Sequence, residues 1–379
     1  MAAKLCLLVL MNSPRKGNGR PSVLLDMRPL QGPSGTRGIG TYARGLLGGL
    51  VRAGYDTRLT LLLDVAYDEP PLPRGRYRLA GCRRRSHGQL AAFEDAVALT
   101  ADIRRIGPDL YHAIDLRLPG RSPCPLVVTL HDLIPWTWGG PRMRGERFRY
   151  MAAFRLLRRA DAVIAVSEAT AGDAVQLRVT SRKRLRVVPE AADPVFAPRE
   201  GATERVAERW GVKEPYLLFV GALDARKDPA SLLEAWKVAR RPHPELQLVI
   251  AGAPGKQAPK SMDGAVQVGR VADDVLADLY SAAACLVFSS RYEGFGLPCL
   301  EAMACGCPVA AFRNSSIPEV VDDAGMLVDD GDADALGNAA AAMFDHRERW
   351  SRAGLARARK FSWDRAARDT ISVYESLLP

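Results

Sequence analysis

Residues 285–302 read CLVFSSRYEGFGLPCLEA. The apolar run Cys285–Ser289 predicts a buried β-strand. The residues after the turn predict a helix, because Pro298 suits the first helical turn, where its missing N–H costs nothing. Between the two, Gly294 and Gly296 let the backbone turn sharply and approach a ligand closely. The stretch is therefore one strand–turn–helix unit of an α/β protein.

Strand-like runs of this kind recur along both halves of the chain, separated by amphipathic stretches such as the helix expected at Ile39–Ala53. This alternation predicts an α/β fold with two doubly wound, Rossmann-like domains built on parallel sheets. The predicted strands are Ser22–Met27, Thr57–Leu63, Leu110–Ala113, Leu126–Leu130, Ala162–Val166, Arg186–Val188, Tyr216–Val220, Gln247–Ala251, Val266–Val268, Cys285–Ser289 and Val309–Ala311.

A proline-rich stretch, Pro189–Gly201, separates the two halves and has the composition of a linker. Two doubly wound domains are expected to face a cleft between the carboxyl ends of their sheets, where such folds bind ligands. The expected organisation is an N-terminal extension at 1–20, an N-terminal domain at 21–190, a linker at 191–201, a C-terminal domain at 202–362, and a C-terminal helix at 363–379 that packs back towards the N-terminal domain.

The composition is that of a soluble globular protein, with 47% apolar and 25% charged residues. A length of 379 residues suits two domains. The longest apolar run, Leu5–Met11, is too short to span a bilayer, and no signal-peptide cleavage site follows it. The seven cysteines lack the paired spacing of a zinc site, so we expect reduced, packed side chains in a reducing cytoplasm.

The turn at 293–297 is expected to bind an anion. The first turn of the following helix has unpaired N–H groups and the positive end of the helix dipole, both suited to phosphate. Glu293 precedes the turn and Glu301 lies one helical turn inside, too far apart in sequence for a tight carboxyl pair by default. Two acids flanking a glycine-rich turn could simply be solvated, but the complete pattern of Glu, seven residues, Glu is specific.

Residues 293–301 resemble the E-x7-E signature of the retaining glycosyltransferases of family 4, which have the GT-B fold of two Rossmann-like domains. The resemblance runs over nearly the whole chain from about Ser22. It implies that Glu293 bonds hydroxyls of the donor sugar and that Glu301 bonds the nucleotide ribose. It also implies that the backbone of four residues meets the sugar and the diphosphate: Gly294, Phe295, Gly296 and Leu297.

The segment Tyr216–Pro229 supports this resemblance. A strand ending at Gly221 is followed by the basic pair Arg226–Lys227, which can clamp a diphosphate whose negative charge grows as the glycosidic bond breaks. Lys227 matches the phosphate-binding lysine of the family. Many members carry an arginine directly after the glycine, where this chain has Ala222, so we expect the clamp to rest on Lys227 with help from Arg226.

Other candidate residues come from weaker matches. Gly38 and Gly40 lie in a glycine loop that resembles the one by which family members approach the donor phosphate and the acceptor. His131, in a segment similar to the family's H-D-L-x-P stretch, is implied to face the donor sugar. Val271 lies in a loop similar to the one that meets the nucleobase. Taken alone, a glycine turn or a single histidine is often structural.

The charge is uneven, because residues 1–190 hold 31 Lys and Arg against 16 Asp and Glu. This excess of +15 favours an anionic partner, or else an arginine-rich composition without function. The stretches Arg83–Arg85 and Arg142–Arg159 suit either an anionic membrane surface or a helix packed on the sheet with solvated arginines. A cytoplasmic location is expected, with peripheral binding to the inner face of the plasma membrane left open. Nucleic acid is not expected, because aromatic residues make up only 7% of the chain.

The expected function is retaining transfer of a hexose, with Glu293, His131 and Lys227 as the catalytic residues. The segments around Gly38 and His131 look most like mannosyltransferase-like members of polysaccharide synthesis, which makes GDP-mannose the expected donor and a glycan or lipid-linked molecule the expected acceptor. No nucleophilic carboxylate is evident for a two-step route, so the family's same-face attack is expected. Neither a metal nor another cofactor is expected, because backbone amides and Lys227 can neutralise the diphosphate.

The sequence leaves one alternative function open and disfavours others. The same fold could use a UDP-sugar, of glucose or N-acetylglucosamine, with a small-molecule acceptor. A sugar-nucleotide epimerase shares the GT-B architecture, but the chain does not resemble its motifs. A nicotinamide oxidoreductase is disfavoured, because the spacing in Gly35–Gly40 is wrong and no Tyr-x-x-x-Lys pair exists in the sequence. Asp330–Asp332, the one Asp-x-Asp match considered as a metal site, is expected to be a solvated acidic loop.

Overall fold

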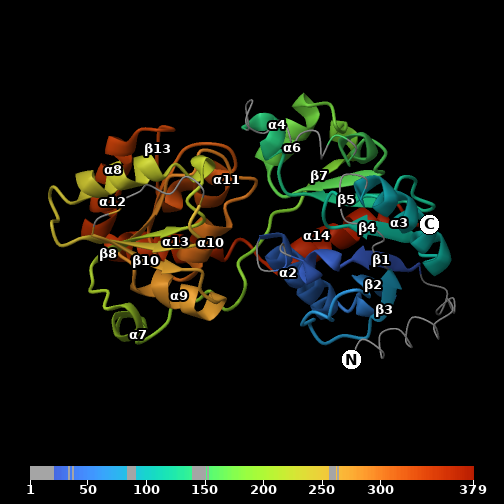
Figure 1. Ribbon diagram of the computed structural model, residues 1–379, viewed down its shortest axis with the longest axis horizontal. Helices are drawn as coiled ribbons and strands as arrows, with labels where there is room; N and C mark the ends of the chain where they lie inside the picture. Colours follow the sequence, from blue (N-terminus) through green and yellow to red (C-terminus); the bar gives the residue numbers. More distant parts are fainter. Residues whose placement is uncertain are drawn as a thin grey trace. The chain divides into compact units, whose positions relative to one another are not determined.

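The structure is a computed structural model that describes residues 21–32, 35, 38–82, 91–138, 151, 153–255, 262 and 264–379. The chain divides into two compact units (Figure 1). Unit 1 consists of residues 1–190 and 363–379, and unit 2 of residues 191–362. The predicted extension at 1–20, the stretch Arg83–Arg85 and most of Arg142–Arg159 lie outside the described residues.

Unit 1 contains a sheet of seven parallel strands in the order β3-β2-β1-β4-β5-β6-β7. The strands are β1 Val23–Asp26, β2 Leu59–Asp64, β3 Arg78–Cys82, β4 Leu110–Ala113, β5 Leu126–Leu130, β6 Ala162–Ala165 and β7 Leu185–Val187. Its α-helices include α2 Gly38–Arg52, α3 Ala91–Ile106, α4 Ile134–Thr137, α6 Glu168–Gln176 and α14 Trp363–Glu375.

Unit 2 contains a sheet of six parallel strands in the order β10-β9-β8-β11-β12-β13. The strands are β8 Tyr216–Val220, β9 Gln247–Ala251, β10 Ala265–Gly269, β11 Cys285–Phe288, β12 Val309–Phe312 and β13 Met326–Val328. The α-helices are α7 Ala202–Trp210, α8 Pro229–Ala239, α9 Asp273–Ala282, α10 Leu297–Ala304, α11 Ile317–Val321, α12 Ala333–Asp345 and α13 Arg347–Ala358. This strand order is that of a Rossmann fold, and the α/β, doubly wound prediction is confirmed.

The central strands formed where the sequence predicted them, because each is a short apolar run that parallel sheets bury on both faces. β1, β4, β6 and β11 are buried along their whole length. Two edge strands were not predicted. β3 begins with the exposed Arg78, and β13 has only three residues, all half-buried. Edge strands need no continuous apolar pattern, so composition alone did not indicate them.

The cysteines of the described residues are free, and all are buried except the half-buried Cys124. No helix in the described ranges is both long and apolar enough to cross a membrane.

Glycines of α2 let α14 pack closely on it, which attaches the end of the chain to unit 1. A Cβ added at Gly45 would lie 2.0 Å from the Trp363 ring, and one at Gly49 would lie 2.3 Å from the Trp363 carbonyl oxygen. Arg52 of α2 also pairs with Asp364 of α14 at 2.6 Å, on the surface. The two helices can therefore approach this closely only because these α2 positions carry no side chain.

Gly49→Ala is expected to lower the free energy of unfolding by about 1–3 kcal/mol, because the new methyl group meets backbone that cannot move freely. Gly172→Ala is the matched control, because Gly172 also lies in a helix but has open space around its Cα. The control should be neutral or stabilising by up to about 1 kcal/mol. Urea denaturation measures both variants, and equal effects would contradict the close packing of α14 on α2.

Candidate active site

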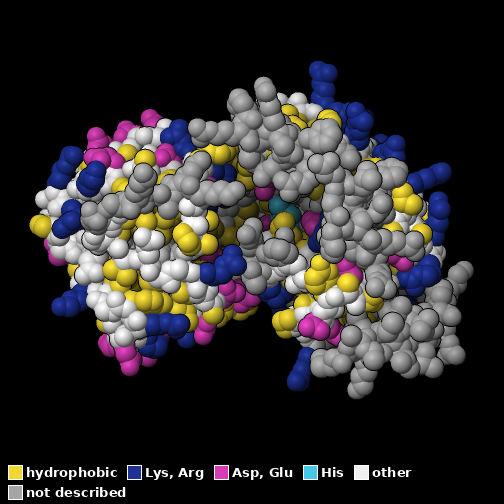
Figure 2. All heavy atoms as spheres, in the orientation of Figure 1, with side chains coloured by type: hydrophobic (Ala, Val, Ile, Leu, Met, Phe, Trp, Pro, Cys, Tyr) yellow, Lys and Arg dark blue, Asp and Glu magenta, His cyan; other side chains and the backbone are white. Residues whose placement is uncertain are grey.

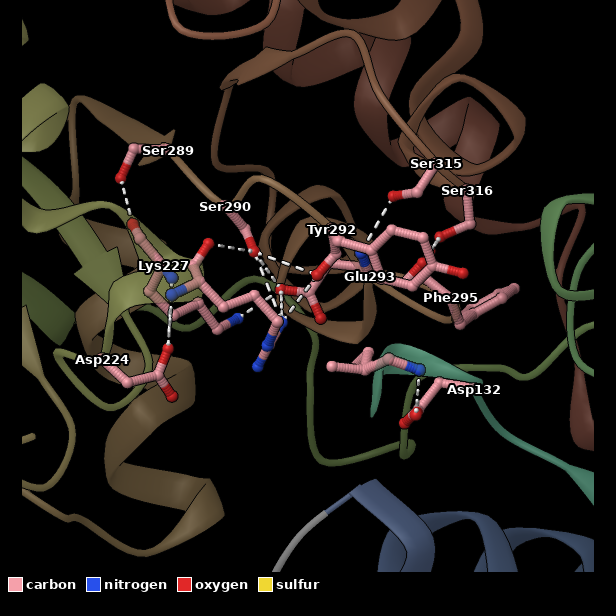
Figure 3. A network of polar contacts seen from close by, with 12 residues as sticks. Asp132, Asp224, Lys227, Ser289, Ser290, Tyr292, Glu293, Phe295, Ser315 and Ser316 are labelled. Carbon is pink, nitrogen blue, oxygen red and sulfur yellow. Dashed lines mark hydrogen bonds and ion pairs between the residues drawn. The ribbon is translucent and has the colours of Figure 1, made fainter. Parts of the chain in front are cut away.

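The loops after β8 and β11 meet where the strand order of unit 2 reverses. β8 and β11 are neighbours, but the chain leaves β8 towards β9 on one side and leaves β11 towards β12 on the other. Doubly wound folds bind ligands at such a switch point, beyond the carboxyl ends of the strands. We call residues 221–228 and 289–297 the switch-point site; Figure 3 shows its polar contacts.

Lys227 is held by its own loop and by the loop after β11. The Asp224 carboxylate accepts hydrogen bonds from the amides of Arg226 and Lys227, at 3.0 and 3.2 Å. The Ser289 hydroxyl donates to the Lys227 carbonyl at 2.7 Å. Gly221, with φ of 146°, has no side chain to obstruct Lys227, whose Cε would lie 3.1 Å from a Cβ there. Lys227 is therefore held in place, and it is only 7% exposed.

Three donors converge on one oxygen of Glu293 (Figure 3). Lys227 Nζ lies 2.6 Å from Oε1, and Arg226 Nη1 lies 2.8 Å from the same atom. The Ser290 hydroxyl donates to it as well. The Glu293 amide donates to Ser315 Oγ at 2.9 Å, which fixes the backbone. The structure thus brings together three of the predicted residues, Arg226, Lys227 and Glu293.

These contacts determine the charge of Glu293. Burial by itself would raise the pKa of this carboxyl above its ordinary value. The positive charges of Lys227 and Arg226, together with the hydrogen bonds from Lys227 and Ser290, outweigh burial and lower the pKa to about 2. Glu293 is therefore ionised at neutral pH and accepts hydrogen bonds. Two cations on one carboxylate give the cluster of Arg226, Lys227 and Glu293 one positive charge in excess, which suits an anion.

The turn after Glu293 leads into α10 through a conformation that glycine favours. Gly296 has φ of 108°, and a Cβ there would lie 2.7 Å from Ile317 Cδ1. The Ser316 hydroxyl donates to the carbonyls of Glu293 and Phe295, at 3.0 and 2.7 Å.

The amide N–H groups of Phe295, Gly296 and Leu297 have no acceptor among the described residues. Backbone donors at a helix start, close in sequence to Glu293 of the cluster with Arg226 and Lys227, form a ready anion site.

The other two predicted residues of unit 2 lie outside the residue ranges of the switch-point site. Glu301, inside α10, is 9% exposed and accepts a hydrogen bond from the Tyr280 hydroxyl at 3.1 Å. Val271 follows β10, which β9 separates from β8. Their roles at the ribose and the nucleobase stay predictions.

In unit 1, the two predicted glycines differ in their surroundings. Gly38 is the exposed first residue of α2. Gly40 is buried, and a Cβ there would lie 2.2 Å from the Gly35 carbonyl oxygen. The close approach at Gly40 therefore has a packing reason within unit 1.

His131 follows β5, and both of its ring nitrogens have partners. Nδ1 lies 3.2 Å from Glu190 Oε1, and Nε2 lies 2.9 Å from the Ile114 carbonyl oxygen. The edge-to-face ring of Tyr42 packs against the imidazole at a centroid distance of 4.8 Å. The histidine is thus fixed by residues from three separate segments of unit 1.

The sequence did not single out several of these partners. Serines carry little signal by themselves, and those of this site come from separate segments: Ser289, Ser290, Ser315 and Ser316. Asp224 could have been recognised, because an aspartate just before a turn often caps it. Within the described residues, no group of three or more His, Cys, Asp or Glu side chains is placed to hold a metal ion.

Comparison with known proteins identifies both halves of the chain. Residues 202–357 match the model described as glycosyl transferases group 1, and residues 36–196 match the one described as glycosyltransferase family 4. Among solved structures, HepE of Anabaena in complex with UDP and glucose matches with a TM-score of 0.71 at 18% identity, covering 94% of this chain and 100% of that one. Fold and matches together define a two-domain glycosyltransferase of the GT-B type.

Curated relatives agree. The chain is 28% identical to O-antigen chain mannosyltransferase B of Escherichia coli, over 94% of this chain and 100% of the relative. It is 30% identical to D-inositol 3-phosphate glycosyltransferase of Saccharomonospora viridis, over 76% of this chain and 75% of the relative. The chain belongs to the glycosyltransferases of family 4, group 1.

The lowered pKa of Glu293 predicts a pH-dependent contribution to stability. A carboxyl with a lowered folded-state pKa stabilises the fold above its ordinary pKa of 4.5, and this contribution is lost as the pH falls towards 2. Glu293→Gln should therefore lose about 3 kcal/mol at pH 7 and show a flatter pH dependence between pH 4.5 and 2. Urea denaturation across this range measures it.

The control is Glu234→Gln, since Glu234 is a half-exposed carboxylate paired with Lys237 on α8. Its stability curve should run parallel to that of the unchanged protein. Parallel curves for Glu293→Gln as well would mean that the buried network does not lower the pKa of Glu293.

Proposed function

We propose that this glycosyltransferase transfers a hexose with retention of configuration, and that the hexose is mannose from GDP-mannose. The observation that carries the proposal is the switch-point site. There Lys227 and Arg226 contact the ionised Glu293, and the three amides of 295–297 have no acceptor among the described residues. In the proposed complex, the diphosphate lies against Lys227 and the amides of 295–297. Glu293 then accepts hydrogen bonds from hydroxyls of the sugar.

The state of Glu293 favours same-face attack over a two-step route. Its Oε1 already accepts from three donors, and a carboxylate with a pKa of about 2 is a weak nucleophile. The acceptor hydroxyl would instead enter beside the departing diphosphate, and a phosphate oxygen would take its proton. The protein contributes position and a fixed positive charge where negative charge develops.

The donor assignment rests on likeness to a mannosyltransferase along its full length. The structurally similar HepE holds UDP and glucose, which keeps a UDP-sugar as the second candidate. Under either donor, Lys227 and Arg226 supply the positive charge that a divalent ion supplies in other transferases, so we propose transfer without a metal.

GDP should raise the melting temperature more than UDP or ADP, because a ligand that binds only the folded state stabilises it. The shift should persist in excess EDTA. Lys227→Met should abolish most of it, whereas Lys237→Met, which removes an exposed lysine of α8, should not. Thermal unfolding with each nucleotide measures this. A larger shift with UDP would overturn the mannose donor, and a shift that requires manganese would overturn the metal-free clamp.

For the acceptor, we propose a glycan or lipid-linked molecule at the inner face of the plasma membrane. A basic surface lies at the amino ends of β5, β6 and β7, and Figure 2 shows Lys and Arg side chains along the rim of unit 1. Its members are exposed, and we call them the amino-edge surface: Arg121, Arg158, Arg159, Arg178, Arg182, Lys183 and Arg184.

Contacts among these loops show that the amino-edge surface is continuous. Arg159 Nη1 donates to the Gly120 carbonyl at 3.0 Å, and Arg158 Nε donates to the Arg178 carbonyl at 3.0 Å. Arg184 Nη1 in turn donates to the Arg158 carbonyl at 3.1 Å. Val175, 39% exposed, adds an apolar side chain just before Arg178. Basic groups with exposed apolar side chains suit an anionic leaflet.

The protein should co-sediment with anionic vesicles and not with zwitterionic ones, and binding should fall steeply with salt. Each basic group near such a surface contributes ~1 kcal/mol within a Debye length of ~8–10 Å. Changing Arg121, Arg182 and Lys183 together to Ser should weaken binding without altering the nucleotide-induced melting shift.

The matched control changes three exposed basic residues of unit 2, Arg209, Lys213 and Arg241, to Ser, which removes the same charge. It should leave vesicle binding nearly unchanged. Equal losses of vesicle binding in both triple variants would mean that binding depends only on net charge. Binding that does not depend on salt, or no binding, would favour a soluble acceptor.

A further inference from the structure

The two partners of His131 require a charged ring. Glu190 Oε1, 3.2 Å from Nδ1, and the Ile114 carbonyl oxygen, 2.9 Å from Nε2, can only accept hydrogen bonds when the carboxyl is ionised. A neutral imidazole carries one N–H and could satisfy only one of them. The geometry is complete only when both nitrogens carry protons, as in an imidazolium.

The surroundings of the ring favour the same state. Burial would lower the pKa of His131, but the hydrogen bond and the negative charge of Glu190 outweigh it, and the Ile114 carbonyl and Asp132 add to the rise. His112, on the neighbouring strand β4, does not compete for the charge. Burial lowers its pKa to about 3, and its nitrogens are bonded to Thr129 and Tyr374.

Burying the charged Glu190 costs free energy of folding that a neutral residue would avoid. It is 3% exposed, and its second oxygen, Oε2, meets no hydrogen-bond donor among the described residues. An unsatisfied buried polar atom costs about 1–3 kcal/mol, and more when it is charged. The hydroxyl of Tyr42, whose ring packs on His131, shares a hydrogen bond with the Thr129 hydroxyl instead. Among the residues that the structure describes, His131 is therefore the hydrogen-bond partner of the Glu190 carboxylate.

We propose that Glu190 is a positioning residue of the active site, which keeps His131 charged and fixes its ring between its own carboxylate and the Ile114 carbonyl. The inference rests on the proposed transfer, in which His131 serves the donor. In this state His131 supplies a fixed positive charge. With both ring nitrogens protonated and bonded, it has no nitrogen left to accept a hydrogen bond from a sugar hydroxyl.

The test is a pH titration of the full chain labelled with ¹⁵N in its histidine rings, without any ligand. The chain has only five histidines, and His131→Gln assigns the signal of His131. Both ring nitrogens should show protonated shifts at pH 7. In Glu190→Gln, the pKa of His131 should fall by about one pH unit or more, since the amide keeps the shape and removes the charge.

Glu168→Gln is the control, because Glu168 is an exposed carboxylate paired with Arg182 elsewhere in unit 1. It should leave the titration of His131 unchanged. A ring that is neutral at pH 7 in the unchanged protein, or an equal pKa in Glu190→Gln, would overturn the proposal. If Glu190→Gln does not fold, the shifts of the unchanged protein still decide whether the ring is charged.

A kinetic measurement separates this inference from the proposed function. Release of GDP from GDP-mannose should decline as the pH rises through the pKa of His131, and this decline should begin at lower pH in Glu190→Gln. If Glu190→Gln lowers the pKa of His131 but leaves the pH profile of GDP release unchanged, the charge contributes only to the fold. That result would overturn the positioning role. Absence of turnover at every pH would count against the proposed donor, while the titration still decides the pairing of Glu190 with His131.

Discussion

The ion pair between Lys227 and Glu293 joins the two loops on which the site of unit 2 depends. One loop follows β8 and the other follows β11, and these strands are neighbours at the reversal of strand order. Because Arg226 and Ser290 converge on the same carboxylate oxygen, neither loop can move without breaking several contacts. The two side chains are only 9% and 13% exposed, so the cost of removing their charges from water is offset only while every partner remains in place. A ligand at this point therefore meets a site whose charges are already fixed.

Much of the fold could be predicted from the sequence, because buried parallel strands are short apolar runs. The helix expected at Ile39–Ala53 formed one residue earlier, at Gly38–Arg52, with its apolar face buried. The edge strands β3 and β13 could not be predicted in the same way. Their pairing comes from a neighbouring strand, and a sequence pattern read in isolation does not contain that neighbour.

The candidate site also has residues that the sequence predicted and residues that it did not. Glu293, Arg226 and Lys227 were predicted from motifs, and the structure joins them directly. Glu190 carries no local signal, because it contacts His131 from 59 positions away in the chain. The sequence therefore indicated which loops carry chemistry, whereas the protonation state of His131 follows only from the two acceptors that the fold places on its ring.

The packing of α14 on α2 makes unit 1 discontinuous, with unit 2 inserted between its parts. During synthesis, the ribosome completes all of unit 2 before it makes α14. Until then the groove at Gly45 and Gly49 lacks the Trp363 side chain and backbone that fill it, and His112 lacks its bond to Tyr374. The N-terminal part of unit 1 therefore exposes this face of α2 while unit 2 is synthesised. Transiently exposed apolar surface favours misfolding and chaperone binding, and α14 covers it once it emerges.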